Sequence, residues 1–340
     1  MTGGEDAALA IGRLERELGG RVGVAARDLA SGAEVLHRPD ELYPLASVFK
    51  VPLMVALLRA VDAGTVTLDE RLELTERIKS PGSTLVHCDP GLAPTLRDLL
   101  YLTITLSDNT ATDMLWRRLG RRAINGAMRE LGLTSIDCTM PNREYYLVEM
   151  VRNGEWEGMS AADIVARWRE LDDAERQAAL ERTEELNAAL TGAEFLRSWV
   201  ERFGWSDEKE YDDGFVFDQA LDNTGTPRDV ADLLAMIAES RCASQGSCEL
   251  MVEVLSRQEW TTRIPAGLPP GLKVANKTGS VSGTVNDAAI VYPPVGPPLI
   301  LVVFCKGLSY GAQAAAETTI ARIAGGVYAS FMAARGTMGP

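Results

Sequence analysis

Histidine is nearly missing from this 340-residue sequence, which contains only His37 and His87. Four ligands for a zinc site are hard to assemble from two histidines and a few scattered cysteines. A Ser-His-Asp triad also finds no supporting motif such as G-x-S-x-G. We therefore expect no metal site and no other cofactor, and we expect that any nucleophilic chemistry uses a base other than histidine.

Cysteine and long apolar runs are scarce as well. The five cysteines are odd in number and show no C-x-x-C spacing, which favours reduced thiols over a disulfide framework. No uninterrupted apolar run reaches the length of a membrane span. The first residues, from Met1 to Asp6, show neither the basic region nor the apolar run of a secretory signal. These features predict a cytoplasmic protein without a membrane partner.

Basic residues are in the minority, with 34 Lys and Arg against 48 Asp and Glu and a net charge of −14. Such a balance argues against a nucleic-acid or anionic-membrane partner, so we expect a small-molecule substrate. The apolar fraction of 46% and charged fraction of 24% are ordinary for a globular protein of one large or two modest domains. The oligomeric state is left open by the sequence.

The sequence does contain an unusually apolar stretch, from Tyr43 to Leu58, that carries a serine and a lysine three positions apart. A helix that is apolar on nearly every side belongs in a protein interior. Ser47 and Lys50 would lie on one face of its first turn. Because burial disfavours the ammonium form, the pKa of Lys50 should fall, and its amine could take a proton from a neighbouring hydroxyl. The pattern predicts that Ser47 is an activated nucleophile.

Hydrophobic periodicity and turn residues predict an α+β chain. Its last three strands are expected to form an antiparallel meander covered by the final helix. Helices are expected over 6–18, 47–64, 95–102, 111–119, 122–131, 161–171, 174–190, 226–240 and 311–334, and extended segments over 22–29, 34–37, 67–73, 272–276, 285–292 and 299–306.

The composition changes between residues 141 and 222, where Glu, Arg and Ala dominate. Two stretches of this region have helical periodicity. The region is predicted to be an inserted helical subdomain or a lid.

Three short motifs occur in one order along the chain. They are S-x-x-K at residues 47–50, S-D-N at 107–109 and K-T-G at 277–279. Each is weak alone, but together they resemble the set found in penicillin-binding proteins and class A β-lactamases. Residues 223–229 are also similar to the helix start that follows the omega loop of that family. The resemblance covers residues 5–140 and 220–335.

The resemblance implies the β-lactamase-like α+β fold, in which an antiparallel sheet is flanked by the N- and C-terminal helices and accompanied by an all-α domain. We therefore predict a sheet domain built from residues 1–42 and 228–340. A helical domain is predicted from 43–227, with the insert at about 141–222. The active site would lie in the cleft between the two domains.

The resemblance also implies the catalytic roles. Ser47 would be the acylated nucleophile, and Lys50 its base or hydrogen-bond partner. Ser107 would pass a proton to the leaving nitrogen, and Lys277 would tune Ser107 electrostatically.

Substrate binding is implied in the same way. Asn109 would hold either Lys50 or an amide of the substrate. The hydroxyls of Thr278 and Ser280 would bind a substrate carboxylate. The backbone N–H groups of Ser47 and Ser280 would form the oxyanion hole. The implied substrate-binding set is Asn109, Thr278, Gly279 and Ser280.

The sequence departs from the family at the residue that removes the acyl group. Class A β-lactamases deacylate through a glutamate within a pattern like E-x-x-L-N. Glu144 and Leu147 fit that spacing, but Val148 stands where asparagine is expected. A second echo that ends at Asn187 lies on a helical pattern too far from Ser107. Without a placed glutamate the acyl-enzyme would hydrolyse slowly or pass its acyl group to an amine or alcohol.

Three interpretations therefore stay open. The protein is a β-lactamase-like serine hydrolase that acts on a β-lactam or a related amide or ester. Alternatively, it is an acyltransferase or an esterase/amidase of specialised metabolism with a non-β-lactam substrate, which suits the predicted cytoplasmic location better. In the third interpretation it is a penicillin-binding sensor module whose acyl-enzyme is the end point.

Overall fold

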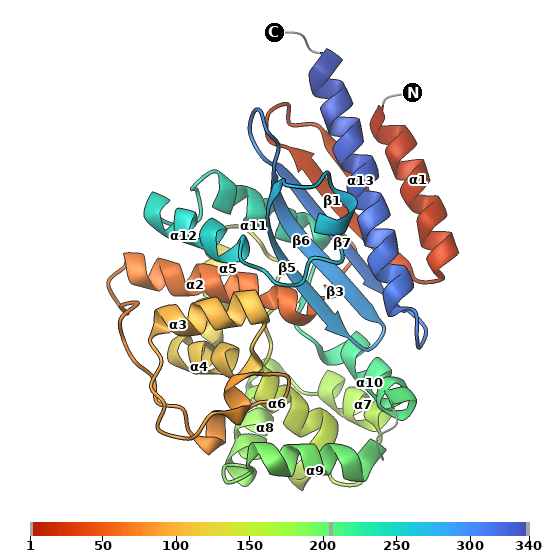
Figure 1. Cartoon of the computed structure of the whole chain (residues 1–340). Helices are drawn as coiled ribbons and strands as arrows, with labels where there is room; N and C mark the ends of the chain where they lie inside the picture. The colour runs from red at the N-terminus through yellow and green to blue at the C-terminus, as the bar shows by residue number, and fades with distance from the viewer. Residues whose placement is uncertain (1–2, 204–206, 338–340) are drawn as a thin grey trace.

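The computed structural model describes residues 3–203 and 207–337. Met1 and Thr2, on which the prediction of a missing secretory signal partly rests, lie outside the described residues. The central feature is a five-stranded sheet in which every neighbouring pair is antiparallel (Figure 1). In spatial order its strands are β2 (Glu34–His37), β1 (Arg21–Asp28), β7 (Leu299–Lys306), β6 (Thr284–Tyr292) and β5 (Lys273–Val281).

Both faces of the sheet are covered. Helices α1 (Gly3–Leu18) and α13 (Gln313–Thr337) lie side by side on one face, and α11 (Pro227–Ala238) packs on the other (Figure 1). This explains why β7 is almost wholly apolar, since a strand buried on both sides has no solvent-facing positions. Its residues alternate between two cores: Leu299, Leu301, Val303 and Cys305 belong to the first, and Ile300, Val302 and Phe304 to the second.

The second core continues without interruption into a group of helices around α2, which joins the sheet to the helical part of the molecule. Burial of α2 agrees with its apolar sequence, because nine consecutive residues from Lys50 to Leu58 are buried. The helices of this group are α2 (Lys50–Asp62), α3 (Leu96–Tyr101), α4 (Asn109–Leu119), α5 (Arg121–Glu130) and α12 (Gln245–Leu255).

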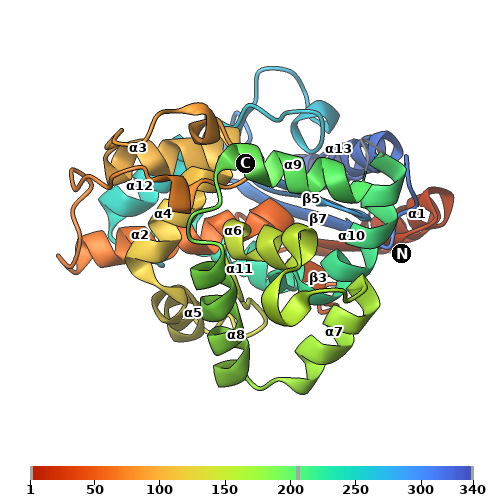
Figure 2. The ribbon, with the colours of Figure 1, turned by 90° about the horizontal axis from the view of Figure 1, so that it is seen from below.

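The predicted insert is helical and lies at the lower end of the molecule in Figure 1, so that it faces the viewer in Figure 2. It has a small core of its own, centred on Trp156, Trp168 and Phe217. Its helices are α6 (Asn142–Tyr146), α7 (Ala161–Glu170), α8 (Asp173–Leu186), α9 (Gly192–Phe203) and α10 (Asp207–Leu221), with a π-helical turn at Leu147–Val151.

The two ends of the insert are tied together where they leave the rest of the chain. Asp137 and Thr224 exchange backbone hydrogen bonds of 2.9 and 3.0 Å. The Asn223 side-chain oxygen accepts from the N–H groups of Thr139 (2.6 Å) and Met140 (3.2 Å). The chain therefore leaves and re-enters the rest of the fold at one narrow junction, with the predicted insert between these residues.

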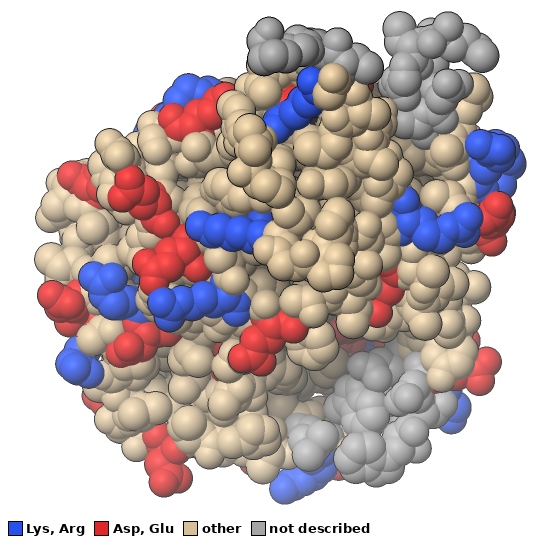
Figure 3. All heavy atoms as spheres, turned by 45° about the horizontal axis from the view of Figure 1, so that its top comes forward, with Lys and Arg blue, Asp and Glu red and all other residues tan. Residues whose placement is uncertain are grey.

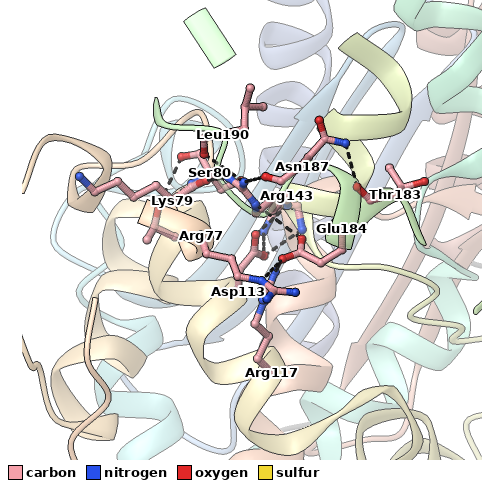
Figure 4. A network of polar contacts seen from close by, with 12 residues as sticks. Arg77, Lys79, Ser80, Asp113, Arg117, Arg143, Thr183, Glu184, Asn187 and Leu190 are labelled. Atoms are coloured by element: carbon pink, nitrogen blue, oxygen red, sulfur yellow. Dashed lines mark hydrogen bonds and ion pairs between the residues drawn. The ribbon is translucent and has the colours of Figure 1, made fainter. Parts of the chain in front are cut away.

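Arg143 anchors the insert to the loop that follows α2. Its guanidinium is fully buried and donates to the carbonyl oxygens of Lys79 (2.6 Å), Asn187 (3.0 Å) and Leu190 (3.1 Å), as Figure 4 shows. One side chain thereby holds three backbone segments together.

A single carboxylate lies close to this buried cation and to two further arginines. Glu184 on α8 lies 3.6 Å from the Arg143 guanidinium, 3.0 Å from that of Arg77 and 2.7 Å from that of Arg117 (Figure 4). The network crosses from the insert to α4 and to the loop after α2, so it fixes the insert relative to the helical part.

The structure agrees with most of the predicted elements and corrects several. The C-terminal meander is confirmed, and β2 and β7 begin and end where predicted. The prediction of an extended segment over 67–73 is wrong, because Arg71 alone in this segment forms a β-bridge, an isolated one to Thr95. Helix α12 was not predicted. Strand β5 does not end at Asn276 but continues to Val281.

The described surface carries mixed charge. On the face in Figure 3, Lys and Arg side chains lie beside Asp and Glu side chains. No helix in residues 3–203 and 207–337 has the length and apolar character needed to cross a bilayer. Within the same residues, no cluster of three His, Cys, Asp or Glu side chains is placed to hold a metal ion, and all five cysteines are free thiols.

Candidate active site

Ser47 lies in a single 3₁₀ turn, Ala46–Phe49, directly before α2 begins at Lys50. The predicted single α-helix from Ser47 is therefore wrong at its first turn. The three-residue spacing still places Ser47 and Lys50 on one side, because residues i and i+3 eclipse in a 3₁₀ helix. Ser47 is the only partly exposed residue between Tyr43 and Leu58, while its neighbours are buried. Its hydroxyl is thus presented to the cleft by a rigid, buried segment.

The residue before Ser47 has a strained backbone. Ala46 has φ of +45°, a region that residues with a Cβ rarely adopt. Its N–H donates to the Asp222 carboxyl oxygen Oδ2 at 2.6 Å. Asp222 stands at the end of the insert and lines the same cleft as Ser47. The insert thus helps to hold the turn that presents Ser47.

Lys50 is fully buried and has three oxygen partners. Its Nζ donates to the Ser107 carbonyl oxygen (2.6 Å), the Ser107 hydroxyl (3.0 Å) and the Asn109 side-chain oxygen (2.7 Å). Burial lowers the pKa of Lys50 to about 7, and the charges of Asp113 and Asp108 oppose that shift. A substantial fraction of its amines is therefore neutral and able to accept a proton at neutral pH.

Ser107 links the two buried lysines. It has φ of +60°, and the following residue, Asp108, caps α4 by accepting from the Ala111 N–H at 2.8 Å. The Ser107 hydroxyl is 3.0 Å from Lys50 Nζ and 3.1 Å from Lys277 Nζ. Burial and then repulsion by Lys50 lower the pKa of Lys277 well below its ordinary value. The helix expected over 111–119 begins two residues earlier, at Asn109 within the S-D-N motif.

The Asn109 side chain makes hydrogen bonds to other residues of the protein. Its side-chain oxygen accepts from Lys50, and its Nδ2 donates to the Pro81 carbonyl oxygen at 2.8 Å. Of the two predicted partners, Lys50 is the one that Asn109 contacts. The amide therefore fixes Lys50 and also joins it to the loop after α2.

The K-T-G motif lies inside β5, which continues beyond the extended segment expected over 272–276. Gly279 is required by close packing: a Cβ there would lie 2.6 Å from the Leu45 carbonyl oxygen and 3.0 Å from the Ser47 nitrogen. Only glycine lets the strand approach the 3₁₀ turn so closely. The approach brings Thr278 and Ser280 to the cleft beside Ser47.

Arg263 is a further site residue that no sequence motif indicates. Its guanidinium is buried and donates to the Ser280 hydroxyl (2.5 Å) and to the carbonyl oxygens of Gly279 (2.8 Å) and Asn286 (2.6 Å). It also pairs with Glu317 on α13 at 3.2 Å. Arg263 adds a positive charge to the end of the cleft that holds Ser280. No local motif surrounds it, so only the folded chain reveals it.

The cleft has a volume of about 350 Å³ and brings the predicted site residues together. Lys50 and Lys277 lie beneath its surface, in contact with Ser107. The predicted residues that line the cleft are Ser47, Ser107, Asn109, Thr278, Gly279 and Ser280.

Glu144, the candidate deacylating residue, is not among the residues that line the cleft. Burial, together with the nearby charge of Glu184, raises its pKa to about 8. The cleft is lined instead by Asn142, whose Nδ2 donates to Asp113 at 2.8 Å. The E-x-x-L spacing therefore does not bring Glu144 to the cleft, and the side chain that lines this part of the cleft is the Asn142 amide.

The fold and the Ser-Lys-Ser-Lys site define a serine acyl-transfer enzyme, and similarity to known proteins gives its family. Residues 7–331 match the Beta-lactamase2 model, described as the β-lactamase enzyme family, and the chain therefore belongs to that family. Its relatives include a β-lactamase of Streptomyces cellulosae, 30% identical over 85% of this chain and 73% of that protein. Another is a carbapenem-hydrolyzing β-lactamase of Klebsiella oxytoca, 26% identical over 86% and 78%.

Solved structures of similar proteins agree with this family assignment. The β-lactamase of Sphaerobacter thermophilus is 28% identical, with a TM-score of 0.69 over 96% of this chain and 97% of that one. The protein PBP-A is 25% identical, with a TM-score of 0.69 over 96% of each chain. The predicted β-lactamase-like α+β fold is confirmed, and the protein is a β-lactamase-like serine hydrolase.

Proposed function

We propose that the protein forms an acyl-enzyme on Ser47 with a β-lactam or a closely related amide. The observation that carries this proposal is the Ser107 hydroxyl, placed between the amines of Lys50 and Lys277. Ser47 Oγ attacks the carbonyl carbon while Lys50 takes its proton. Ser107 then passes a proton to the leaving nitrogen, the C–N bond breaks, and an ester remains on Ser47.

Two backbone N–H groups, those of Ser47 and Ser280, are proposed to stabilise the oxyanion. The close approach at Gly279 supports this assignment, because it brings the strand to within contact of the Ser47 nitrogen. Charge supports a substrate with a carboxylate. The Ser280 hydroxyl accepts a hydrogen bond from the Arg263 cation, and Thr278 lines the cleft beside it.

Removal of the acyl group is proposed to be slow. The carboxyl groups that line the cleft are already engaged: Asp222 accepts from the Ala46 N–H, and Glu317 pairs with Arg263. Asn142 cannot act as a base. These contacts favour the penicillin-binding interpretation, in which the acyl-enzyme persists, as a second candidate function. The names of the relatives favour a β-lactam over the substrates of an acyltransferase or esterase.

The test is an intact-mass time course with one penicillin and one cephalosporin. We expect one added acyl group per chain and a lifetime of minutes or longer. The Ser47→Ala variant should show no adduct and should keep the same unfolding temperature. An adduct that forms at the same rate in Ser47→Ala would exclude Ser47 as the nucleophile, and clearance within seconds would exclude the persistent acyl-enzyme.

A further inference from the structure

The last helix of the insert, α10, lies where β5 turns back into β6 at the end of the sheet (Figure 1). Residues three and four positions apart lie on one face of a helix. On α10 such a face carries Phe215 and Asp218 and continues to Asp222, the first residue after the helix. These three residues contact the β5–β6 turn and the turn that presents Ser47. The insert is thus joined to the active site at two separate places.

The first of these places is the turn between β5 and β6. Asp218 Oδ2 accepts from the Ser282 N–H at 2.6 Å. The Nε2 of Gln219 donates to the Ser282 carbonyl oxygen at 3.2 Å and to the Thr284 hydroxyl at 2.9 Å. Both polar groups of the Ser282 backbone are therefore held by the helix.

Two glycines show how closely the helix and this turn approach each other. A Cβ at Gly214 would lie 2.7 Å from the Ser282 hydroxyl oxygen, and a Cβ at Gly283 would overlap the Phe215 ring. The backbone of Gly283 also has φ of +70°, which favours glycine. Because the contact leaves no room for a side chain on either partner, the helix fixes the position of the turn.

The second place is the turn that presents Ser47. Asp222, one helical turn after Asp218, accepts from the Ala46 N–H through Oδ2 at 2.6 Å. Ala46 has the strained φ of +45° described above, and such a conformation persists only where its surroundings hold it. The next N–H along the chain is that of Ser47. The carboxyl group of Asp222 therefore helps to fix the direction of that N–H.

The two oxyanion donors proposed above lie close to these contacts along the chain. The Ser47 N–H directly follows the N–H that Asp222 holds. The Ser280 N–H lies two residues before the N–H that Asp218 holds. We propose that Asp218 and Asp222 are positioning residues that set the separation of the two oxyanion donors, an inference that rests on the proposed function.

The size of the effect follows from how an oxyanion hole works. Removal of one donor costs about a hundred- to a thousandfold in rate. A displaced donor keeps part of its effect, and a misplacement of about 1 Å costs about a hundredfold. Each aspartate holds a different donor segment, so loss of either contact releases one donor while the other stays in place. We expect each loss to slow acylation by about ten- to a hundredfold.

The experiment compares alanine and asparagine at both positions. Asp222→Ala and Asp218→Ala remove the acceptor, whereas Asp222→Asn and Asp218→Asn keep a side-chain oxygen that accepts the same N–H. Asp212→Ala, at an exposed position of α10, is the matched control. If Asp218→Ala does not fold, Gln219→Leu tests the same turn, because it removes the other side chain that holds Ser282.

Acylation by one penicillin is measured by stopped flow over a range of concentrations. The alanine variants should lose about ten- to a hundredfold in the saturating rate, with the half-saturating concentration within about threefold of the wild type, because the oxyanion forms only after binding. The asparagine variants and the control should stay within about threefold of the wild type in both values. Unchanged rates in the alanine variants would overturn the proposal, as would equal losses for alanine and asparagine.

The ester carbonyl of the acyl-enzyme reports on the oxyanion hole directly. Its stretching frequency, measured by infrared difference spectroscopy with a penicillin labelled with ¹³C at the lactam carbonyl, falls when the hole donates hydrogen bonds to it. We expect the frequency to rise in Asp222→Ala and Asp218→Ala and to stay unchanged in the asparagine variants. An unchanged frequency in both alanine variants would contradict the positioning role, since a loss of stability alone does not move it.

Hydrogen exchange of the free protein separates this inference from the proposed function, because it needs no acylation. Exchange of the Ala46 and Ser282 N–H groups is followed by NMR. Asp222→Ala should speed exchange at Ala46 at least tenfold and leave Ser282 unchanged, and Asp218→Ala should do the reverse. Unchanged exchange in both variants overturns the positioning even if Ser47 is acylated. The expected exchange together with no adduct in the wild type supports the positioning and rejects the proposed function.

Discussion

At the scale of single residues, Asn142 and Asp113 are placed the wrong way round for activating water, because a carboxylate would have to face the cleft. Asn142 donates from Nδ2 to Asp113 Oδ1, so the side chain that faces the cleft is the amide and the carboxyl group lies behind it. Burial raises the pKa of Asp113 to about 6. A glutamate introduced at position 142 alone would face this second carboxyl group.

We therefore predict that the double change Asp113→Asn with Asn142→Glu shortens the lifetime of the acyl-enzyme about a hundredfold. A positioned general base contributes about that much, and the change at 113 removes the carboxyl group that would face the new carboxylate. The measurement is decay of the adduct mass after excess penicillin is removed. Asn142→Glu alone should gain less, and Asp113→Asn alone nothing. An unchanged lifetime in the double variant would show that position 142 cannot reach the ester.

Lys50 should make acylation depend on pH. Its pKa is about 7, and only its neutral form accepts the Ser47 proton, so the rate should rise about tenfold per unit below pH 7 and level off above it. Stopped-flow acylation between pH 5 and 9 gives the profile.

Asp222, whose pKa burial raises to about 7, titrates in the same range. The profile is therefore repeated on Asp222→Asn, where the rise that remains belongs to Lys50. Loss of the entire rise in that variant would assign it to Asp222 and to the Ala46 turn.

At the scale of elements, Arg143 connects the insert to the rest of the protein through three backbone carbonyls. Replacement by methionine leaves those carbonyls and part of the Glu184 charge unsatisfied in a buried place. We predict that Arg143→Met lowers the free energy of unfolding by about 3 kcal/mol.

The matched control is Arg77→Met, which removes a more exposed partner of the same Glu184 and should cost about 0–1 kcal/mol. Urea unfolding gives both values. Similar small losses in the two variants would show that the buried contacts of Arg143 add little.

At this scale, sequence patterns are sufficient to predict some secondary-structure elements but not others. Strands with a local signature were predicted well: β7 has apolar residues throughout and its limits agree. Strand β5 was ended too early because Lys277 and Thr278 look like solvent-facing turn residues, although they are buried against the helices. Helix α12 was missed because polar residues and Gly246 dilute its first turn.

The site residues also fall into two groups, those that a local motif indicates and those that it does not. Ser47, Ser107 and Lys277 sit in motifs whose spacing is local, and the sequence indicates them. Arg263 and Asp222 reach the cleft only through tertiary packing, from a loop and from the end of the insert. No periodicity marks such residues, so only the folded structure reveals them.

At the scale of the whole molecule, two buried aspartates lie where the insert meets the sheet. Asp218 and Asp222 lie one turn apart, and Asp218 accepts from the Ser282 N–H at 2.6 Å. Burial, and then the charge of Asp222, raise the pKa of Asp218 well above its ordinary value. An acid with a raised pKa holds its proton longer when folded than when unfolded. Its contribution to stability is therefore greatest at low pH and is lost as the pH rises toward the folded pKa.

We predict that the wild-type chain loses unfolding free energy between pH 5 and 8 more steeply than Asp218→Asn does. Denaturant unfolding at four pH values gives the two slopes. Asp212→Asn, at an exposed position of the same helix, should follow the wild type. Parallel wild-type and Asp218→Asn curves would mean that Asp218 does not titrate in this range.

The pairing of the two ends of the insert affects how the length of this segment can vary. Because Asp137 and Thr224 pair directly, the ends of the segment between them already meet, and the entropy of closing a loop grows only slowly with its length. A segment of another size could be exchanged at this point without disturbing the sheet. Since Asn142 and Asp222 stand at the two ends of that segment, each exchange would also rewrite part of the cleft. Length variation at one site could thus diversify both substrate choice and turnover on an unchanged scaffold.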